Sequence, residues 1–226
     1  MSIGYSLFID IAAFLLFAFL HTFLASFKVK SILAKRIGKA MAFYRLAYNI
    51  IFLLIFFYLF ENLPRPDYEL FELKFPWDVI VLLPQFLALA GIIWTFRYFS
   101  FGEFTGISQI KRWMTGNFTG GWEEGMQSEG NSKDVFDEKL TLKIEGPYKV
   151  VRHPLYLFTI IFLMLRPTMD LYYLVFLIFL IAYFYTGSFY EERKLVSAFG
   201  DQYRKYQISV PRLFPLRSFK PPAENY

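Results

Sequence analysis

The chain of 226 residues contains no cysteine and only two histidines, His21 and His153. The absence of cysteine excludes disulfide bonds, thiolate metal ligands and a cysteine nucleophile. Two histidines are too few for a metal site built from several imidazoles, so we expect no bound metal. Apolar residues, in contrast, make up 56% of the sequence, and aromatic residues make up 22%. A soluble domain of this composition would expose much apolar surface to water, which argues against a soluble protein.

Five apolar runs predict an all-α integral membrane protein with about five transmembrane helices. They cover residues 3–27, 42–60, 77–99, 155–165 and 171–190. A span needs about 20 residues to cross a hydrocarbon core of about 30 Å. The fourth run has only 11 residues, so it either begins earlier, near Val150, or crosses only part of the bilayer. A tight turn at Pro167 is expected to make the last two runs a helical hairpin.

The distribution of Lys and Arg predicts the orientation of these helices. The segment 28–45 holds six basic residues, the segment 97–153 holds eight, and the tail from Arg193 onward holds seven. With five spans and the N-terminus outside, 21 of the 24 basic residues fall on one side, which should be cytoplasmic. The first run has no basic residue before Lys28, unlike a signal peptide, and is expected to be a retained helix.

We expect the whole chain to form one membrane domain with three parts. Residues 1–99 should contain three spans, 100–145 a cytoplasmic loop, and 146–226 a ligand-binding hairpin with a cytoplasmic tail. The aromatic and basic segment 101–114 is typical of an interfacial element. The segment 115–131 is rich in glycine, serine and acidic residues, which is typical of a flexible loop.

Each apolar run has a polar residue near its predicted cytoplasmic end. These residues are His21, Asn49, Arg97, His153 and the pair Glu191-Glu192. Polar groups within spans are costly, so each needs a physical reason. Capping and snorkelling explain any single one of them, but all of them together indicate a polar pocket at the cytoplasmic face.

The segment 146–156, GPYKVVRHPLY, combines residues that shape the backbone with residues that bind charge. Pro154 favours the first turn of a helix, whose N-terminus presents free N–H groups to an anion. Arg152 can bind a carboxylate through two hydrogen bonds. The aromatic faces of Tyr148 and Tyr156 attract cations such as a sulfonium. This segment therefore indicates a site for a charged ligand.

Two carboxylates at the end of the hairpin, Glu191 and Glu192, complete this set of charged groups. They can accept hydrogen bonds from the hydroxyl or amino groups of a ligand. The alternative is a structural one, in which Arg152 and Glu191 form an ion pair that holds the tail against the hairpin.

Two segments resemble the isoprenylcysteine carboxyl methyltransferase and phospholipid methyltransferase superfamily. They are GPYKVVRHPLYLF at 146–158 and EERKLVSAFGDQYRKYQISVPRLFP at 191–215. Their shared features are Arg-His-Pro followed by Tyr, a Glu-Glu pair after a hairpin, and a tail with Phe-Gly and Val-Pro. The runs HTFLASFKVK, YRLAYN and FGEFTGISQ are similar to the methanethiol S-methyltransferase and NnrU-like subfamily. One departure is Phe158, where the family usually has glycine.

The resemblance implies S-adenosylmethionine as the cofactor and methyl transfer to a small thiol or other apolar acceptor, on the cytoplasmic side of a bacterial inner membrane. It maps cofactor binding onto Tyr148, Val151, Arg152, His153, Pro154, Tyr156, Glu191 and Glu192. We assign His21, as a base for a thiol, and Arg193 to catalysis. The expected acceptor-site residues are Tyr44, Asn49 and Gln109. The expected partners are this small-molecule or lipid-like acceptor and membrane lipids, and not nucleic acid.

Three alternatives remain open. The acceptor could instead be a prenylcysteine carboxylate or a lipid, which requires a lateral opening between helices. A b-type haem protein would use His21 and His153 as axial ligands, but it leaves the Arg-His-Pro and Glu-Glu elements unexplained. A catalytically silent membrane protein would keep the fold without binding the cofactor.

Overall fold

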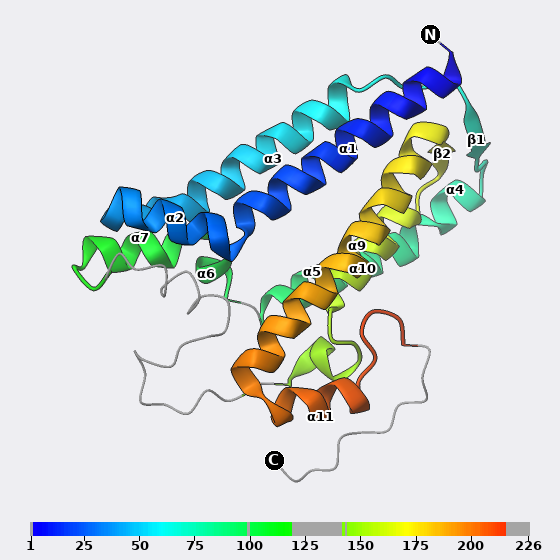
Figure 1. The fold of residues 1–226 in the computed structure, drawn as a ribbon. Helices are drawn as coiled ribbons and strands as arrows, with labels where there is room; N and C mark the ends of the chain where they lie inside the picture. The colour runs from blue at the N-terminus through cyan, green and yellow to red at the C-terminus, as the bar shows by residue number, and fades with distance from the viewer. Residues whose placement is uncertain (1, 99, 119–141, 143, 216–226) are drawn as a thin grey trace. The chain divides into compact units, whose positions relative to one another are not determined.

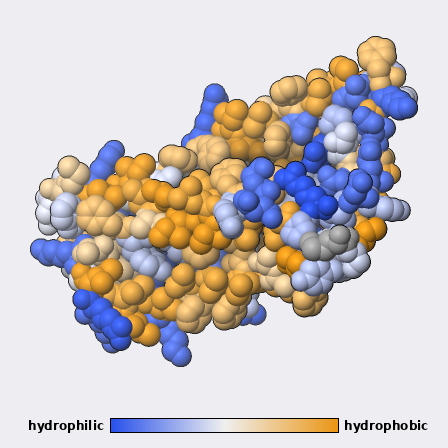
Figure 2. Space-filling model, turned by 90° about the horizontal axis from the view of Figure 1, so that it is seen from above, coloured by the Kyte–Doolittle hydropathy of each residue, from blue (hydrophilic) through white to orange (hydrophobic). Residues whose placement is uncertain are grey.

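The computed structural model describes residues 2–98, 100–118, 142 and 144–215, and its regular structure is almost entirely helical (Figure 1). Within these residues, four candidate spans are long and apolar enough to cross a membrane: Ile3–Ala25, Lys28–Asn62, Trp77–Phe96 and Leu171–Phe199. Apolar side chains cover much of the surface in Figure 2, as contact with lipid requires. The prediction of a mainly helical chain with apolar helices able to span a membrane is confirmed, and the described residues provide four such helices where about five were expected. Most of the expected flexible loop, 115–131, lies outside the described residues.

The chain divides into two compact units, each built from two separate segments. The first unit comprises Met1–Arg65 and Ser100–Glu138. The second unit comprises Pro66–Phe99 and Lys139–Tyr226. The three predicted parts of the chain therefore do not coincide with the compact units, because residues from the first and last parts pack together in the second unit.

Two long helices of the first unit lie side by side and run in opposite directions (Figure 1). They are α1 (Ile3–Ala25) and α3 (Tyr44–Asn62). Helix α1 stops because the backbone of Ser26 is extended, with ψ 149°. A short helix, α2 (Phe27–Ile37), and the 3-10 helix η1 (Gly38–Phe43) then lead into α3. The expected first run therefore ends two residues early, and its continuation is a separate helix.

The predicted interfacial segment 101–114 forms two short helices, α6 (Phe101–Thr105) and α7 (Ile107–Met114). Gly106 separates them with a positive φ of 96°. A Cβ atom at this position would lie 2.7 Å from the backbone nitrogen of Leu46, so only glycine fits this close approach to α3.

The second unit contains the other apolar helices and a small sheet. Its elements are β1 (Glu69–Glu72), α4 (Trp77–Ile80), α5 (Leu82–Phe96), η2 (Gly146–Lys149), α9 (Pro154–Met164), β2 (Thr168–Asp170), α10 (Leu171–Phe199) and α11 (Asp201–Ser209). Strands β1 and β2 pair in antiparallel orientation. The all-α prediction omitted this sheet. Strands of four and three residues are too short to show the alternation of apolar and polar residues by which a strand is recognised in a sequence.

Helix α10 continues nine residues beyond the apolar run that predicted it, from Tyr190 to Phe199. The hydropathy signal stops at Glu191, but Glu, Arg, Lys and Leu are good helix formers, so the helix extends past the apolar region. Gly200, with φ 58°, ends it and begins α11. This polar extension carries Glu191, Glu192 and Arg193.

Helices α5 and α9 pack closely through a glycine on one side and a phenylalanine on the other. A Cβ atom on Gly91 would lie 2.5 to 2.7 Å from three ring atoms of Phe158. Farther along the same pair of helices, the Gln85 side chain donates a 3.0 Å hydrogen bond to the carbonyl of Phe162. The large residue that departs from the family pattern at position 158 is therefore accommodated by a residue with no side chain on α5.

We expect Gly91→Ala to lower the free energy of unfolding by about 1–3 kcal/mol, because the added methyl group forces the Phe158 ring aside. Gly187→Ala is the matched control, since no atom lies within 4 Å of a Cβ there. It should be neutral or stabilise α10 by up to about 1 kcal/mol. Thermal unfolding in detergent measures both. In a Phe158→Ala background the cost of Gly91→Ala should shrink, and an unchanged cost would contradict the proposed contact.

Candidate functional site

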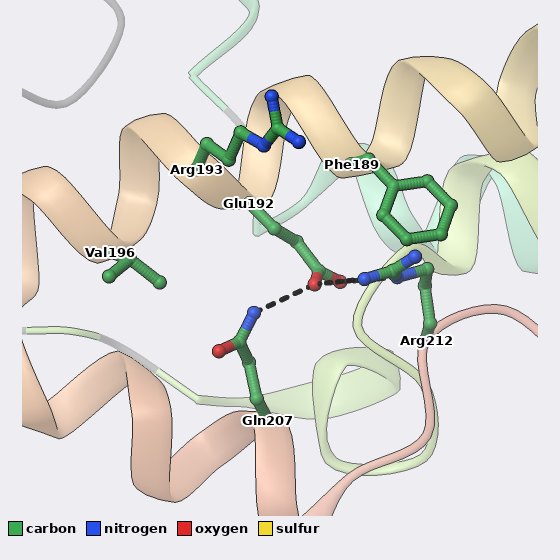
Figure 3. A pocket seen from close by; sticks show the side chains of 6 residues that line it. All are labelled: Phe189, Glu192, Arg193, Val196, Gln207 and Arg212. Atoms are coloured by element: carbon green, nitrogen blue, oxygen red, sulfur yellow. Dashed lines mark hydrogen bonds and ion pairs between the residues drawn. The ribbon is translucent and has the colours of Figure 1, made fainter.

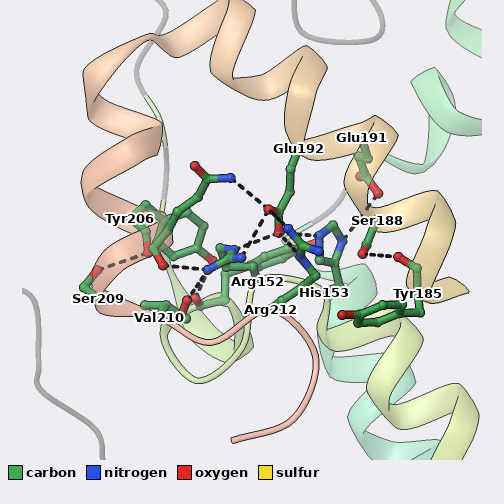
Figure 4. Close-up of polar contacts among 12 residues, drawn as sticks. Arg152, His153, Tyr185, Ser188, Glu191, Glu192, Tyr206, Ser209, Val210 and Arg212 are labelled. Atoms are coloured by element: carbon green, nitrogen blue, oxygen red, sulfur yellow. Dashed lines mark hydrogen bonds and ion pairs between the residues drawn. The ribbon is translucent and has the colours of Figure 1, made fainter. Parts of the chain in front are cut away.

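The carboxylate of Glu192, on the polar extension of α10, is the centre of a buried network (Figure 4). It is 2% exposed and accepts hydrogen bonds from four side chains. Arg152 donates from Nε at 2.8 Å and Nη2 at 3.1 Å, and Arg212 donates from Nε at 3.1 Å and Nη2 at 2.9 Å. Gln207 donates at 2.8 Å, and Nε2 of His153 lies 3.1 Å away. One buried anion thus binds two guanidinium groups, an amide and an imidazole.

Arg152 also ties the tail directly to the start of α9. Its Nη1 atom donates to the carbonyls of Gln207, at 2.8 Å, and Val210. The backbone amides of residues 152–153 donate to the carbonyls of residues 211–212, at 2.9 and 3.0 Å. The guanidinium therefore makes four hydrogen bonds inside the protein, and it fixes where the tail crosses the N-terminus of α9.

The backbone before α9 has the special conformations that its sequence predicts. Gly146 has a positive φ of 54°, and a Cβ atom there would lie 2.4 Å from the ring of Tyr98. Pro147 is in the first turn of η2, and Pro154 begins α9 directly after His153, whose backbone is not helical, with φ −122° and ψ 66°. These residues turn the chain so that the side chains of 152 and 153 both face Glu192.

The second carboxylate, Glu191, is half-exposed and faces the aromatic side of the site. Its Oε2 atom accepts a 3.1 Å hydrogen bond from the hydroxyl of Tyr156 and lies 3.4 Å from Nδ1 of His153. The rings of His153, Tyr156 and Phe184 are stacked in sequence, with centroids 5.3 and 4.5 Å apart. This stack orders the imidazole between the two carboxylates.

The two carboxylates determine the charge of His153. Burial by itself lowers the pKa of this imidazole, but hydrogen bonds to Glu191 and Glu192 outweigh burial and raise the pKa above its ordinary value. The pKa of Tyr148 is raised to about 12, first by burial and then by the charge of Glu191. The two carboxylates therefore favour the protonated form of the imidazole, and the phenol is neutral at neutral pH.

An open pocket of about 210 Å³ lies beside the network (Figure 3). Its lining residues are Phe189, Glu192, Arg193, Val196, Gln207 and Arg212. The Arg212 guanidinium lies 3.6 Å from the centroid of the Phe189 ring, a cation–π contact. The pocket thus offers two arginines, an aromatic ring and an amide to a ligand.

The sequence-predicted cofactor residues all lie in the second unit, but they have different surroundings. Arg152, His153, Tyr156, Glu191 and Glu192 come together around the network. Val151 is 1% exposed and packs with apolar residues of α9 and the tail. The Tyr148 carbonyl accepts a 2.6 Å hydrogen bond from the hydroxyl of Tyr206. The structural ion pair considered for Arg152 is formed with Glu192, and not with Glu191.

The other predicted site residues, except Arg193, lie in the first unit. The His21 ring lies 5.1 Å from the Tyr48 ring and 4.9 Å from the Phe52 ring. The Tyr44 hydroxyl donates to the carbonyl of Leu24 at 2.8 Å. Helices α1 and α3 are therefore joined by aromatic contacts and hydrogen bonds at the His21 level.

Asn49 contacts α6, and Gln109 lies on α7. Asn49 donates to the carbonyls of Phe104 and Thr105, at 2.9 and 3.2 Å. Gln109 is 5% exposed and donates to the Glu103 carboxylate at 3.1 Å, while its amide oxygen is buried without a hydrogen-bond partner. Arg112 also binds Glu103, at 2.7 Å. Asn49 is therefore used structurally, whereas Gln109 keeps one acceptor for a ligand or water.

Sequence reasoning missed Gln207 and Arg212. Both lie within the tail segment that resembles the methyltransferase superfamily, and Arg212 follows the Val-Pro pair directly. The position of Arg212 next to the Val-Pro pair was the sequence feature that could have identified it as a site residue. Among the described residues, no group of three histidine or acidic side chains is arranged to hold a metal ion.

We expect Glu192→Gln to destabilise the protein by about 3–5 kcal/mol, because it leaves Arg152 and Arg212 buried or half-buried without their counter-charge. Glu191→Gln is the matched control on the next residue. It should cost less than about 1 kcal/mol, since Glu191 is 49% exposed. Thermal unfolding of the ligand-free protein in detergent compares the two variants. Equal losses would show that Glu192 is not the residue that holds the tail in place.

The chain is similar to several methanethiol S-methyltransferases. Methanethiol S-methyltransferase 1 of Bradyrhizobium diazoefficiens is 41% identical over 70 residues, which is 31% of this chain and 25% of that protein. The enzyme of Pseudomonas sp. (strain GM41(2012)) is 38% identical over 81 residues, 36% of this chain and 31% of that protein. The enzyme of Pseudomonas deceptionensis is 36% identical over 78 residues, 34% of this chain and 30% of that protein.

These matches cover about a quarter to a third of the length of the curated relatives. No family model matches the chain. No solved structure matches it either. The similarity to the methanethiol S-methyltransferases is therefore confined to stretches of 70 to 81 residues.

Proposed function

We propose that the protein transfers a methyl group from S-adenosylmethionine to a small thiol, or to another small apolar acceptor, at the cytoplasmic face of a bacterial inner membrane. The observation that carries this proposal is the charged pocket beside Glu192, which is lined by α10, α11 and the tail. It lies in a chain related to enzymes named for thiol methylation. Its lining residues other than Phe189 lie in the segment 191–215, which resembles the wider methyltransferase superfamily.

The chemistry of the pocket fits one end of the cofactor. S-adenosylmethionine carries a carboxylate, an ammonium group, a sulfonium and an adenosine. Arg193 and Arg212 suit the carboxylate, and Glu191 suits an ammonium or hydroxyl group. The Phe189 ring suits a cation or a flat base. A volume of about 210 Å³ is below the roughly 300–1,000 Å³ of sites that enclose a whole ligand, so the pocket holds only part of the molecule.

When bound, the cofactor supplies a methyl group already activated by the sulfonium. The protein then has to position the reactants and exclude water, and needs no covalent nucleophile. Arg152 and Glu192 fix the tail and thereby position Arg212. His153, Tyr156 and Glu191 form the aromatic and anionic side of the cofactor site. Val151 and Pro154 shape its backbone.

Thiol chemistry requires a group that removes a proton from sulfur. We assign this role to His21, with Tyr44, Asn49 and Gln109 on the acceptor side. The buried, unpartnered amide oxygen of Gln109 supports a ligand contact there. The hydrogen bonds of Tyr44 and Asn49 to backbone carbonyls support a role in holding α1, α3 and α6 together around that site.

The five-span arrangement, with α9 and α10 as a hairpin, is supported by the pairing of β1 with β2. Strand β1 precedes α4 and α5, and strand β2 follows α9. The hydrogen bonds between the strands require the chain to return to the level from which it started, which supports α9 as part of a return span. At 1.5 Å per residue the 11 residues of α9 cover only part of the hydrocarbon core, so we propose that the residues before α9 complete the crossing. Both compact units belong to this one domain.

The alternatives differ in what they require of these residues. A prenylcysteine or lipid acceptor needs the same cofactor site and differs only in the acceptor. A haem ligand at His153 would have to displace a carboxylate, because both ring nitrogens lie within 3.4 Å of one. A catalytically silent protein predicts no cofactor binding at all.

Purified protein should transfer labelled methyl groups from S-adenosylmethionine to small thiols faster than to prenylcysteines or phospholipids. Arg193→Gln and Arg212→Gln should each weaken cofactor binding about 10- to 150-fold, which corresponds to one charge-assisted hydrogen bond of roughly 1.5–3 kcal/mol. Isothermal titration measures the affinity. Arg204→Gln is the control, because Arg204 lies on α11 with its side chain 67% exposed. Wild-type affinity in both pocket variants would place the cofactor elsewhere.

The topology can be tested by cysteine labelling without background, because the natural chain has no cysteine. Ser2→Cys and Glu72→Cys should react with an impermeant reagent added from outside the cell. Lys205→Cys should react only after the membrane is opened. Labelling of Ser2→Cys and Lys205→Cys from the same side would contradict an odd number of spans between them.

A further inference from the structure

Helix α2 and the start of η1 present an exposed face of positive charge. Lys28, Lys35, Arg36 and Lys39 are all exposed. On a helix, residues 28, 35 and 36 share one face with Ile32, which is 48% exposed. The sequence contains no acidic residue from position 11 to position 60, so none of the flanking segments supplies a local counter-charge.

The packing of α2 fixes which side of the helix faces outward. Ala34 is 7% exposed and belongs to a small core with Met41, Ala42 and Phe118. The partly buried Leu33 packs against the same core. The apolar side of α2 therefore packs on η1, and its basic side faces outward.

This basic face lies at one end of the two long apolar helices of the same unit. One residue, Ser26, separates the end of α1 from the start of α2, and η1 leads directly into α3. Figure 1 shows α2 and α7 at this same end of α1 and α3. The charges on α2 are too many for the hydrocarbon core, so the helix lies at the headgroup level.

Exposed apolar residues around η1 and α7 extend the membrane-facing surface as far as the headgroup level at which α2 lies. Phe43 is 41% exposed, Trp113 43% and Met114 74%. The Phe43 and Trp113 rings lie 5.1 Å apart. Aromatic side chains beside basic ones are typical of the interface between lipid tails and headgroups.

We propose that the face formed by Lys28, Lys35, Arg36 and Lys39 is a binding site for anionic phospholipid headgroups. Charge complementarity selects an anion. The position of the face, at the end of two spans, makes a membrane lipid the anion that meets it. A cluster of four or more basic residues directly after a span is the arrangement that recognises anionic lipids. This proposal rests on the membrane insertion of α1 and α3, and not on the methyl-transfer chemistry.

The test is native mass spectrometry of the full chain in detergent, titrated with phosphatidylglycerol or phosphatidylcholine. The wild-type protein should retain phosphatidylglycerol in preference to phosphatidylcholine. The triple variant Lys35→Gln/Arg36→Gln/Lys39→Gln should bind phosphatidylglycerol roughly 100-fold more weakly, from about 1 kcal/mol for each basic residue near the surface. A charge-preserving variant, Lys35→Arg/Arg36→Lys/Lys39→Arg, should keep the wild-type affinity.

The matched control removes three exposed charges from the second unit, as Lys149→Gln/Arg204→Gln/Lys205→Gln. It should bind phosphatidylglycerol like the wild type. Equal loss in this control, or equal retention of both lipids by the wild type, would overturn the proposal. Displacement of phosphatidylglycerol by millimolar inorganic phosphate would also overturn it, because the site would then recognise a free anion.

Discussion

One buried carboxylate determines how the second unit is assembled. Glu192 has almost no contact with solvent, and it is surrounded by Arg152, Arg212 and His153. A buried charge is tolerated only where the surrounding donors replace the water that it loses. These donors come from the start of α9, from α11 and from the tail. The path of the tail is therefore set by the need to solvate Glu192.

This arrangement separates two roles within a pair of neighbouring residues. The carboxylate of Glu192 holds the tail in place through its hydrogen bonds. Glu191, in contrast, is half-exposed, and within the network it contacts Tyr156 and His153. Consecutive residues on a helix point about 100° apart, so one carboxylate can face the tail while the other faces away. A ligand that reaches the pocket meets Glu191, Arg193 and Arg212. The buried ion pair between Arg152 and Glu192 keeps these groups in position.

The sequence predicted the long helices well, because apolar runs are a strong signal for spans. Helix α10 was placed correctly at its start, and α9 within one residue at each end. The break at Ser26 and the short helix after it could not be predicted. A run of apolar residues does not show where within it the backbone leaves the helical conformation. The pairing of β1 with β2 depends on two segments about 100 residues apart, which no local pattern connects.

The site could be predicted as a group of residues but not as a geometry. Arg152, His153 and the two glutamates were identified from their chemistry and from family resemblance. Which glutamate is buried depends on the rotation of α10, and this is set by packing far from the motif. Arg212 is 60 residues from Arg152, so its place beside the Val-Pro pair could mark it as part of the motif, but its contact with Glu192 depends on the return of the tail to α9.

The network around Glu192 also sets a condition on any state in which the tail is detached. Gln207 and Arg212 donate to the carboxylate only when the tail packs against the start of α9. Until then the carboxylate has fewer donors than it needs, and water must hydrate the polar end of α10. Packing of the tail therefore replaces this water with side-chain donors.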